Sequence, residues 1–161
     1  MKINPKCGCQ AKHNTRLEID VFAGMGLFGS SMPEYQTEGA SGMDLRACDE
    51  VTLEPMERVL VGTGLHLSIP ESFEGQVRPR SGMSYKRGLV SVLGTIDSDY
   101  RGEIKVILIN LSNERQTIDT GERIAQLVIA PVVRASLNPV DELSQLGDTD
   151  RGSDGFGSTG S

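Results

Sequence analysis

Hydrophobic residues recur along this chain at every second position or in short unbroken runs, which is the pattern of β-strands. Segments 17–21 and 65–69 alternate apolar with polar residues, while segments 104–111 (IKVILINL) and 124–133 (IAQLVIAPVV) are nearly continuous, as in strands buried on both faces. Glycine and proline interrupt the pattern at short intervals. We therefore predict an all-β sandwich or barrel built from many short strands.

One segment departs from the strand pattern. Residues 81–87 (SGMSYKR) carry no run of strand-forming residues, and Gly88 follows them directly. Glycine adopts the left-handed conformation that commonly ends a helix. The sequence therefore predicts one short helix inside the β domain.

The two ends of the chain differ from its middle. Residues 1–14 are polar and predict a flexible extension, although Cys7, Cys9 and His13 could supply three ligands of a metal site. From residue 143 onward the chain is rich in glycine, with Phe156 as its aromatic residue. Such a tail is typical of a disordered end, and it also suits a lid that closes over phosphates.

Length and charge limit the classes of function. A chain of 161 residues fits one domain, and its net charge of −6 argues against bulk binding to nucleic acid or to an anionic membrane. No stretch approaches the ~20 apolar residues of a membrane span, and no signal peptide is evident. We expect a cytoplasmic protein without a disulfide framework, in which Cys48 is a packed thiol.

A possible anion site lies in segment 79–88 (PRSGMSYKRG). Arg80 supplies a fixed fork of donors, Ser81 a hydroxyl, and Gly82 a backbone that a ligand can approach closely. A helix that starts here would point its free N–H groups at the same place. A plain turn followed by a helix cap would produce the same sequence, so both interpretations stand.

Two other polar residues interrupt apolar strands. Asp44 lies between Met43 and Leu45, where a carboxylate must either accept backbone hydrogen bonds or lie near a cation. Gln126 interrupts the run 123–129 (RIAQLVI), where it either marks an exposed strand edge or faces a phosphate.

The densest group of charges is segment 94–103 (GTIDSDYRGE), between two apolar stretches. Asp97 could orient and partly deprotonate a water as a general base, while Asp99 could form a salt bridge with Arg101. Tyr100 offers a flat face to a sugar or base. The alternative is a charged, solvated β-turn.

Taken in order, these segments resemble the five motifs of the trimeric dUTPase family. The matching segments are 32–47, 80–88, 94–110, 121–129 and 151–160, and the resemblance runs from about residue 15 to the end. It implies a jelly-roll-like β-clip fold with one short helix, assembled as a homotrimer. The implied organisation is a β domain at 15–142 and an arm at 143–161 that closes over a neighbouring subunit's active site.

The resemblance also implies an activity, the hydrolysis of dUTP to dUMP and pyrophosphate with Mg²⁺. This reaction keeps uracil out of DNA and supplies dUMP for dTTP synthesis. Asp97 would hold the attacking water, and Asp44 would reach the metal through water or be structural. The residues expected to contact the phosphates are Arg80, Ser81, Gly82, Gln126, Arg151, Gly157 and Ser158.

Selection of the nucleoside is implied by other positions. Backbone groups of Gly94, Thr95 and Ile96 would pair with uracil, in a hairpin that also contains Ser91. Tyr100 would lie against the deoxyribose and leave no room for a 2′-hydroxyl. Lys105 would lie beside the substrate through its main chain, and Phe156 would stack on the uracil ring.

Two residues depart from the family pattern. Many members have asparagine where this chain has Ser91, and glycine is usual where it has Asp154. We therefore expect a uracil contact that is made by backbone groups only or is weaker, and some loss of affinity. Two other functions remain as alternatives. One is a dCTP deaminase, possibly bifunctional, with Glu103 as its catalytic glutamate, and the other is a regulatory trimer without enzymatic activity.

Overall fold

The computed structural model describes residues 17–24 and 32–154. Within these ranges the chain forms eleven short strands, one α-helix and one turn of 3-10 helix, which confirms the predicted all-β fold with a single short helix. The strands are β1 Asp20–Ala23, β2 Met43–Arg46, β3 Val51–Leu53, β4 Arg58–Gly62, β5 Leu65–Ser68, β6 Phe73–Arg78, β7 Leu89–Ser91, β8 Gly94–Ile96, β9 Lys105–Asn110, β10 Gln116–Ile118 and β11 Arg123–Pro131.

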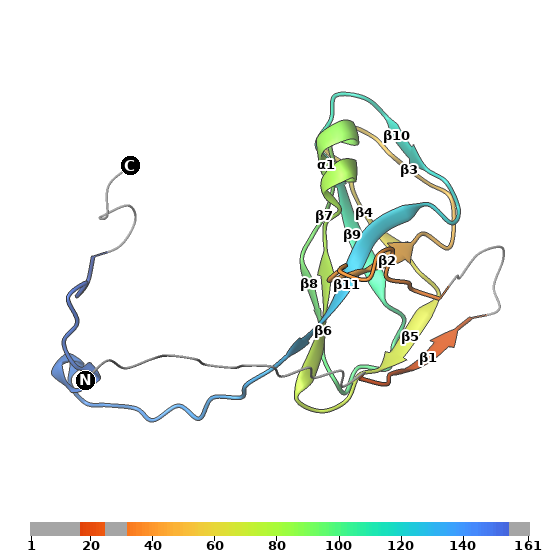
Figure 1. Cartoon of the computed structure of the whole chain (residues 1–161). Coiled ribbons are helices and arrows are strands. Elements are labelled where there is room, and N and C mark those ends of the chain that lie inside the picture. The colour runs from red at the N-terminus through yellow and green to blue at the C-terminus, as the bar shows by residue number, and fades with distance from the viewer. Residues whose placement is uncertain (1–16, 25–31, 155–161) are drawn as a thin grey trace, which may run out of the picture.

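All strand pairs are antiparallel, and the strands form four small sheets. The largest has the order β2-β11-β6-β8, and a second has the order β4-β9-β7; β1 pairs with β5, and β10 pairs with β3. Figure 1 shows these sheets wrapped around a common interior, with β11 crossing the middle of the molecule. Because β11 pairs with β2 on one edge and β6 on the other, it places segments from three parts of the sequence side by side.

The core is aliphatic, in keeping with an aromatic content of 4% and no tryptophan. Its largest fully buried side chains are Leu45, Leu53, Leu65, Leu89, Ile104, Leu108, Ile118, Ile124, Leu127, Val61, Val77 and Val106. Burial of one such side chain contributes about 1.5–3 kcal/mol to folding. Cys48 is a half-buried free thiol, and its pKa is raised mainly by burial and further by a hydrogen bond to Asp49.

The prediction that segment 104–111 is buried on both faces is only half correct. In β9 the residues Val106 and Leu108 point into the core, whereas Ile107 is 39% exposed on the opposite face. Ile107 pairs with Leu60 of β4, which is 61% exposed. The outer face of the β4–β9–β7 sheet therefore has an apolar centre at Leu60 and Ile107, and no second layer of the described chain covers it.

The short helix α1 is Ser81–Arg87, as the sequence predicts. Gly88 ends it in the left-handed conformation, with φ 66°, and donates its N–H to the Ser84 carbonyl at 3.1 Å. A Cβ atom at this position would lie 3.0 Å from Ser112, so both conformation and space favour glycine. Met83 anchors the helix in the core, which leaves its first turn at the surface.

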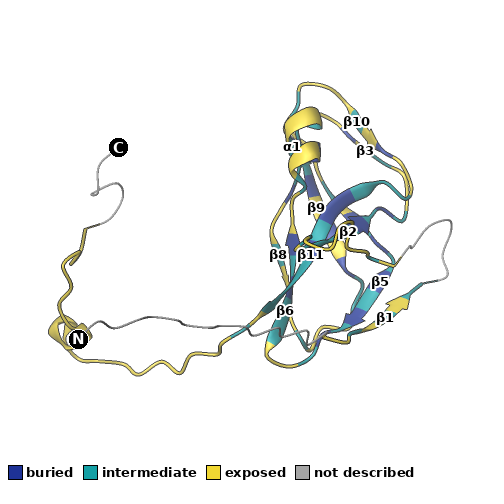
Figure 2. Cartoon of the chain, in the orientation of Figure 1, coloured by how far each residue is buried: buried dark blue, intermediate teal, exposed yellow. Residues whose placement is uncertain are grey.

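After β11 the chain leaves the body of the molecule (Figure 1). All residues from Val133 to Asp154 are exposed, as the yellow course of this segment in Figure 2 shows. The segment contains the 3-10 turn Leu143–Leu146 and several exposed apolar side chains, among them Val133 and Leu137. It therefore buries almost none of its apolar surface against the rest of the described chain.

Several sequence predictions concern residues outside the described ranges. These are the flexible extension with Cys7, Cys9 and His13, and the arm residues Phe156, Gly157 and Ser158. The domain limits 15–142 and 143–161 remain predictions. In the described ranges, no helix has the length and apolar character that crossing a membrane requires.

Candidate active site

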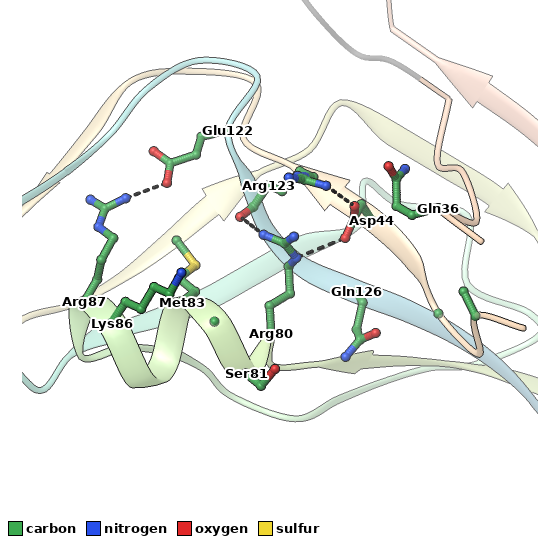
Figure 3. Close-up of a pocket in the computed structure, with 13 residues that line it drawn as sticks. Gln36, Asp44, Arg80, Ser81, Met83, Lys86, Arg87, Glu122, Arg123 and Gln126 are labelled. Carbon is green, nitrogen blue, oxygen red and sulfur yellow. Dashed lines mark hydrogen bonds and ion pairs between the residues drawn. The ribbon is translucent and has the colours of Figure 1, made fainter.

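The predicted first, second and fourth segments meet in one cavity of about 550 Å³ (Figure 3). Asp44 lies in β2 and Gln126 in β11, and Arg80 is the residue before α1. Strand register explains the meeting, because Gln126 of β11 is paired with Asp44 on one edge and with Arg78 on the other. Helix α1 then begins where β6 ends, so its first turn lines the same cavity.

Asp44 holds two arginines in this cavity. Its Oδ1 lies 3.0 Å from Nε of Arg80, and its Oδ2 lies 3.2 Å from Nη1 of Arg123. The Asp44 side chain is only 10% exposed, which strengthens both ion pairs relative to surface pairs. Nη1 of Arg80 also donates to the Arg123 carbonyl at 3.0 Å, which fixes the plane of the guanidinium.

The cavity is cationic overall. Two arginines on one aspartate leave a net charge of +1, and Lys86 of α1 lines the same space. Arg87 is paired with Glu122, so that pair adds no net charge. The arrangement favours the anion-site interpretation of segment 79–88 over a plain turn and cap, because fixed donors and excess positive charge converge on one opening.

Two glycines of the cavity wall, Gly42 and Gly82, differ in how closely they are packed. Nε2 of Gln126 donates to the Pro79 carbonyl at 2.9 Å, and a Cβ atom on Gly42 would come within 2.6 Å of its Oε1. By contrast, a Cβ atom on Gly82 would meet nothing within 4 Å. Packing in this chain therefore does not require glycine at 82, which is consistent with close approach of a ligand there.

Sequence reasoning missed the role of Arg123. Its partner Asp44 lies 79 residues away, and only the pairing of β2 with β11 brings them together. The sequence interpretation left Asp44 either bonded to backbone N–H groups or near a cation. The structure places it against two cations, both of them arginine side chains.

Replacing Asp44 by asparagine is expected to raise KM for a triphosphate substrate about tenfold, with a smaller change in kcat. The amide cannot hold both guanidinium groups, so Arg80 loses its fixed orientation. Steady-state kinetics with Asp119→Asn as the matched control checks this, because Asp119 is exposed on the turn before β11. An unchanged KM would contradict the orienting role of Asp44.

Asp97 lies in a different cavity, of about 640 Å³, between the turn after β8 and the start of β6. The turn is closed by the Tyr100 N–H, which donates to the Asp97 carbonyl at 3.1 Å. The predicted salt bridge between Asp99 and Arg101 is wrong: no such pair occurs in the described residues. Nη1 of Arg101 instead donates to the carbonyls of Ser98 and Tyr100, at 2.7 and 2.8 Å.

One chain does not bring Asp97 and Arg80 together. Ile96 is paired with Gly75 near the start of β6, whereas Arg80 follows the end of that strand at Arg78. The two ends of β6 are roughly 16 Å apart at the usual rise per strand residue. A single phosphate chain therefore cannot contact both cavities of one subunit at the atoms that would react.

The remaining predicted site residues lie in strands β7 to β9, in the turn after β8 and in the tail. Gly94, Thr95 and Ile96 form β8, and Tyr100 is 43% exposed beside them. The Ser91 side chain points into the core, where its hydroxyl has no hydrogen-bond partner. Lys105 is paired with Glu103 at 3.5 Å, and Arg151 is exposed in the tail, where its Nε donates to the Asp154 carbonyl.

Comparison with known proteins identifies the family. The sequence matches the dUTPase family over residues 29–160. It is 57% identical over 131 residues to the deoxyuridine 5′-triphosphate nucleotidohydrolase of Anaeromyxobacter sp. (strain Fw109-5), covering 80% of this chain and 87% of that protein. The enzyme of the same name from Rhizobium etli (strain CIAT 652) is 49% identical over 154 residues, covering 92% and 97%.

Solved structures agree with the sequence relatives. The dUTPase of Staphylococcus bacteriophage 80alpha with dUpNHpp superposes with a TM-score of 0.78 at 30% identity, covering 89% of this chain and 99% of that one. Its G164S mutant gives a TM-score of 0.80. The match extends over the five motif segments and the fold that positions them, and the chain belongs to the dUTPase family.

Proposed function

We propose that this chain hydrolyses dUTP to dUMP and pyrophosphate, in active sites shared between the subunits of a homotrimer. The observation that carries the proposal is the presence, on one chain, of a cationic cavity and a separate exposed aspartate turn, in a protein 49–57% identical to dUTP nucleotidohydrolases. The cavity suits a triphosphate, and the aspartate suits a water. The same reaction would keep uracil out of DNA and supply dUMP for dTTP synthesis.

The cavity at α1 is the proposed phosphate site. Arg80, fixed by Asp44, would donate to the phosphates, and the backbone at Ser81 and Gly82 would approach them closely. Gln126, which lines the same cavity, would contact the phosphate chain. From the arm, Arg151 would pair with the γ-phosphate, and Gly157 with Ser158 would add backbone contacts.

Asp97 is the proposed catalytic residue. As a carboxylate it would hold a water in line with the α-phosphorus and accept its proton as the water attacks. Asp97 is exposed at the edge of its cavity, so a water and a substrate can both reach it. The proton acceptor and the phosphate donors would then come from different subunits.

Mg²⁺ is the proposed cofactor. In the described residues, no group of three or more side chains is placed to hold a metal by itself. This fits a Mg²⁺ ion carried by the triphosphate and water, as is usual for nucleotide enzymes. Both oxygens of Asp44 are engaged by arginines, so Asp44 would reach the ion only through water. When bound, Mg²⁺ would neutralise charge that develops on the phosphates.

Strand β8 is the proposed site of uracil recognition. It is the edge strand of its sheet, so one of its sides presents backbone groups that do not pair with β6. Gly94, Thr95 and Ile96 would offer these groups to the base, while Tyr100 would lie against the deoxyribose and exclude a 2′-hydroxyl. Ser91 and Lys105 would contribute through their main chain, and Phe156 would stack on the base.

The homotrimer is supported by three features of one subunit. The two halves of the site lie at opposite ends of β6, so each half needs a partner from another copy. The outer face of the β4–β9–β7 sheet is apolar around Leu60 and Ile107, as an interface would be. The tail leaves the body with apolar side chains exposed, which suits an arm that closes over a neighbouring subunit.

The alternative functions receive less support. Glu103 would have to act as the catalytic glutamate of a dCTP deaminase, but its carboxylate accepts the Gly64 N–H at 2.9 Å and pairs with Lys105. A regulatory trimer without activity would not need the fixed Asp44–Arg80 pair. The regulatory trimer predicts no pyrophosphate release from dUTP, and the deaminase predicts release of ammonia from dCTP.

Pyrophosphate release with Mg²⁺, offered dUTP, dTTP, dCTP and UTP separately, tests the proposed function. We expect fast release from dUTP and at least about a hundredfold slower release from the other three. Ammonia release from dCTP would establish the deaminase instead. The absence of release from all four nucleotides would leave the regulatory trimer as the better account.

A further inference from the structure

Residues 63–66, which connect β4 to β5 and begin β5, hold the chain that follows the Asp97 turn. Thr63 Oγ1 donates to the Ile104 carbonyl at 2.6 Å, and the Ile104 N–H donates to the Leu65 carbonyl at 2.7 Å. None of the residues 63–66 lies in the five motif segments. The segment is therefore an anchor that motif comparison does not identify.

Two side-chain contacts extend this anchor toward the turn. Glu103 Oε1 accepts the Gly64 N–H at 2.9 Å, and Nδ1 of His66 lies 2.9 Å from the Arg101 carbonyl. Because a carbonyl only accepts, Nδ1 carries the hydrogen and donates. The His66 ring is itself packed edge-on against Phe22 of β1, with ring centroids 5.7 Å apart. The residues on both sides of Gly102 are therefore hydrogen-bonded to residues 64–66.

The Tyr100 ring packs against residues 102–103. Its phenol donates to the Glu103 carbonyl at 2.9 Å, and a Cβ atom on Gly102 would collide with the phenol ring. The ring is nevertheless 43% exposed. One side of Tyr100 is therefore fixed against residues 102–103, and the rest is free to meet a ligand.

We propose that Glu103 is a positioning residue, which sets the discrimination between deoxyribose and ribose by fixing Tyr100 through the anchor at residues 63–66. The inference rests on the proposed function, in which Tyr100 excludes the 2′-hydroxyl. Exclusion by contact works only if the ring cannot retreat by a fraction of an ångström. The Glu103 carboxylate prevents this retreat because it accepts the Gly64 N–H. This contact fixes residue 103, whose carbonyl accepts the phenol hydrogen bond.

The test compares kcat/KM for dUTP and UTP in Glu103→Ala and Glu103→Gln. We expect the dUTP-to-UTP ratio to fall about tenfold in the alanine variant, mainly through faster turnover of UTP relative to dUTP. Glutamine keeps an oxygen that accepts the Gly64 N–H while losing the charge that pairs with Lys105. We therefore expect it to restore most of the ratio, which a lost ion pair alone would not explain.

A double-mutant cycle separates positioning from a general loss of structure. Tyr100→Phe removes the phenol hydrogen bond directly, so adding Glu103→Ala to it should lower the ratio little further. Additive effects, or an unchanged ratio in Glu103→Ala, would overturn the proposal. Gly102→Ala should also lower the ratio by displacing the ring, while Gly39→Ala, where a Cβ atom meets nothing within 4 Å, serves as its control.

A structural measurement keeps this proposal separable from the proposed function. If the wild-type protein releases no pyrophosphate from dUTP, the proposed function fails. Crystal structures of the wild type and of Glu103→Ala then decide the positioning claim alone. A Tyr100 phenol that leaves the carbonyl of residue 103 in the variant supports it, and a phenol that keeps its place contradicts it.

Discussion

Replacing Asp97 by asparagine is expected to slow pyrophosphate release from dUTP by about a thousandfold, with little change in KM. Asparagine has nearly the same shape but cannot accept a proton from the attacking water. The closure of the turn is carried by backbone groups and by Arg101, not by the Asp97 side chain, so the local structure should survive. Steady-state kinetics with dUTP and Mg²⁺ measures both constants.

Asp99→Asn is the matched control for this variant. Asp99 lies two residues further along the same exposed turn and lines the same cavity, so it carries the same change of charge. We expect it to retain most of the wild-type kcat. Equal losses in both variants would show that the negative charge of the turn matters rather than one carboxylate. Activity that survives in Asp97→Asn would remove Asp97 from the chemical step.

Local signals in the sequence were sufficient to predict individual elements of secondary structure, such as the helix at 81–87 and the strand at 65–69. The helix at 81–87 is confirmed because its end depends on one residue, Gly88, whose left-handed conformation is a property of glycine itself. The alternation at 65–69 likewise reports directly on β5, where Leu65 and Leu67 face the core. Such features depend on neighbours along the chain, which the sequence displays.

Contacts between distant segments were harder to predict. The pairing of Asp44 with Arg123 depends on the register of β2 against β11, which includes an irregularity between Arg123 and Ala125. The predicted Asp99–Arg101 salt bridge is wrong although the two residues are close in the sequence. The guanidinium of Arg101 donates instead to the carbonyls of Ser98 and Tyr100 in its own turn.

One chain by itself also does not show whether a residue on its surface is covered by another copy. The apolar run of β9 predicts a strand covered on both faces, yet Ile107 is exposed in the single subunit. The run is explained if another copy covers the β4–β9–β7 sheet, because a strand in such an interface is under the same selection for apolar residues as a core strand. The apparent error of the sequence prediction then becomes an argument for the trimer.

Mixing two inactive variants should restore activity if the sites are shared. Arg80→Ala removes a phosphate donor and Asp97→Asn removes the proton acceptor, so each variant alone is expected to be nearly inactive. In a trimer that takes the two residues of each site from different subunits, some sites of a mixed assembly contain both wild-type residues. Random assembly of equal amounts makes about a quarter of the sites intact.

The experiment is co-refolding or co-expression of the two chains, followed by pyrophosphate release from dUTP. The control mixes Arg80→Ala with Gln126→Ala, because both residues line one cavity of the same chain. Every cavity in that mixture carries one lesion, so no intact site forms and no recovery is expected. Recovery in the first mixture but not in the second would place Arg80 and Asp97 in one site from two chains. Equal behaviour of the two mixtures would contradict the shared site, and the roughly 16 Å between the ends of β6 would then have to be closed within one subunit.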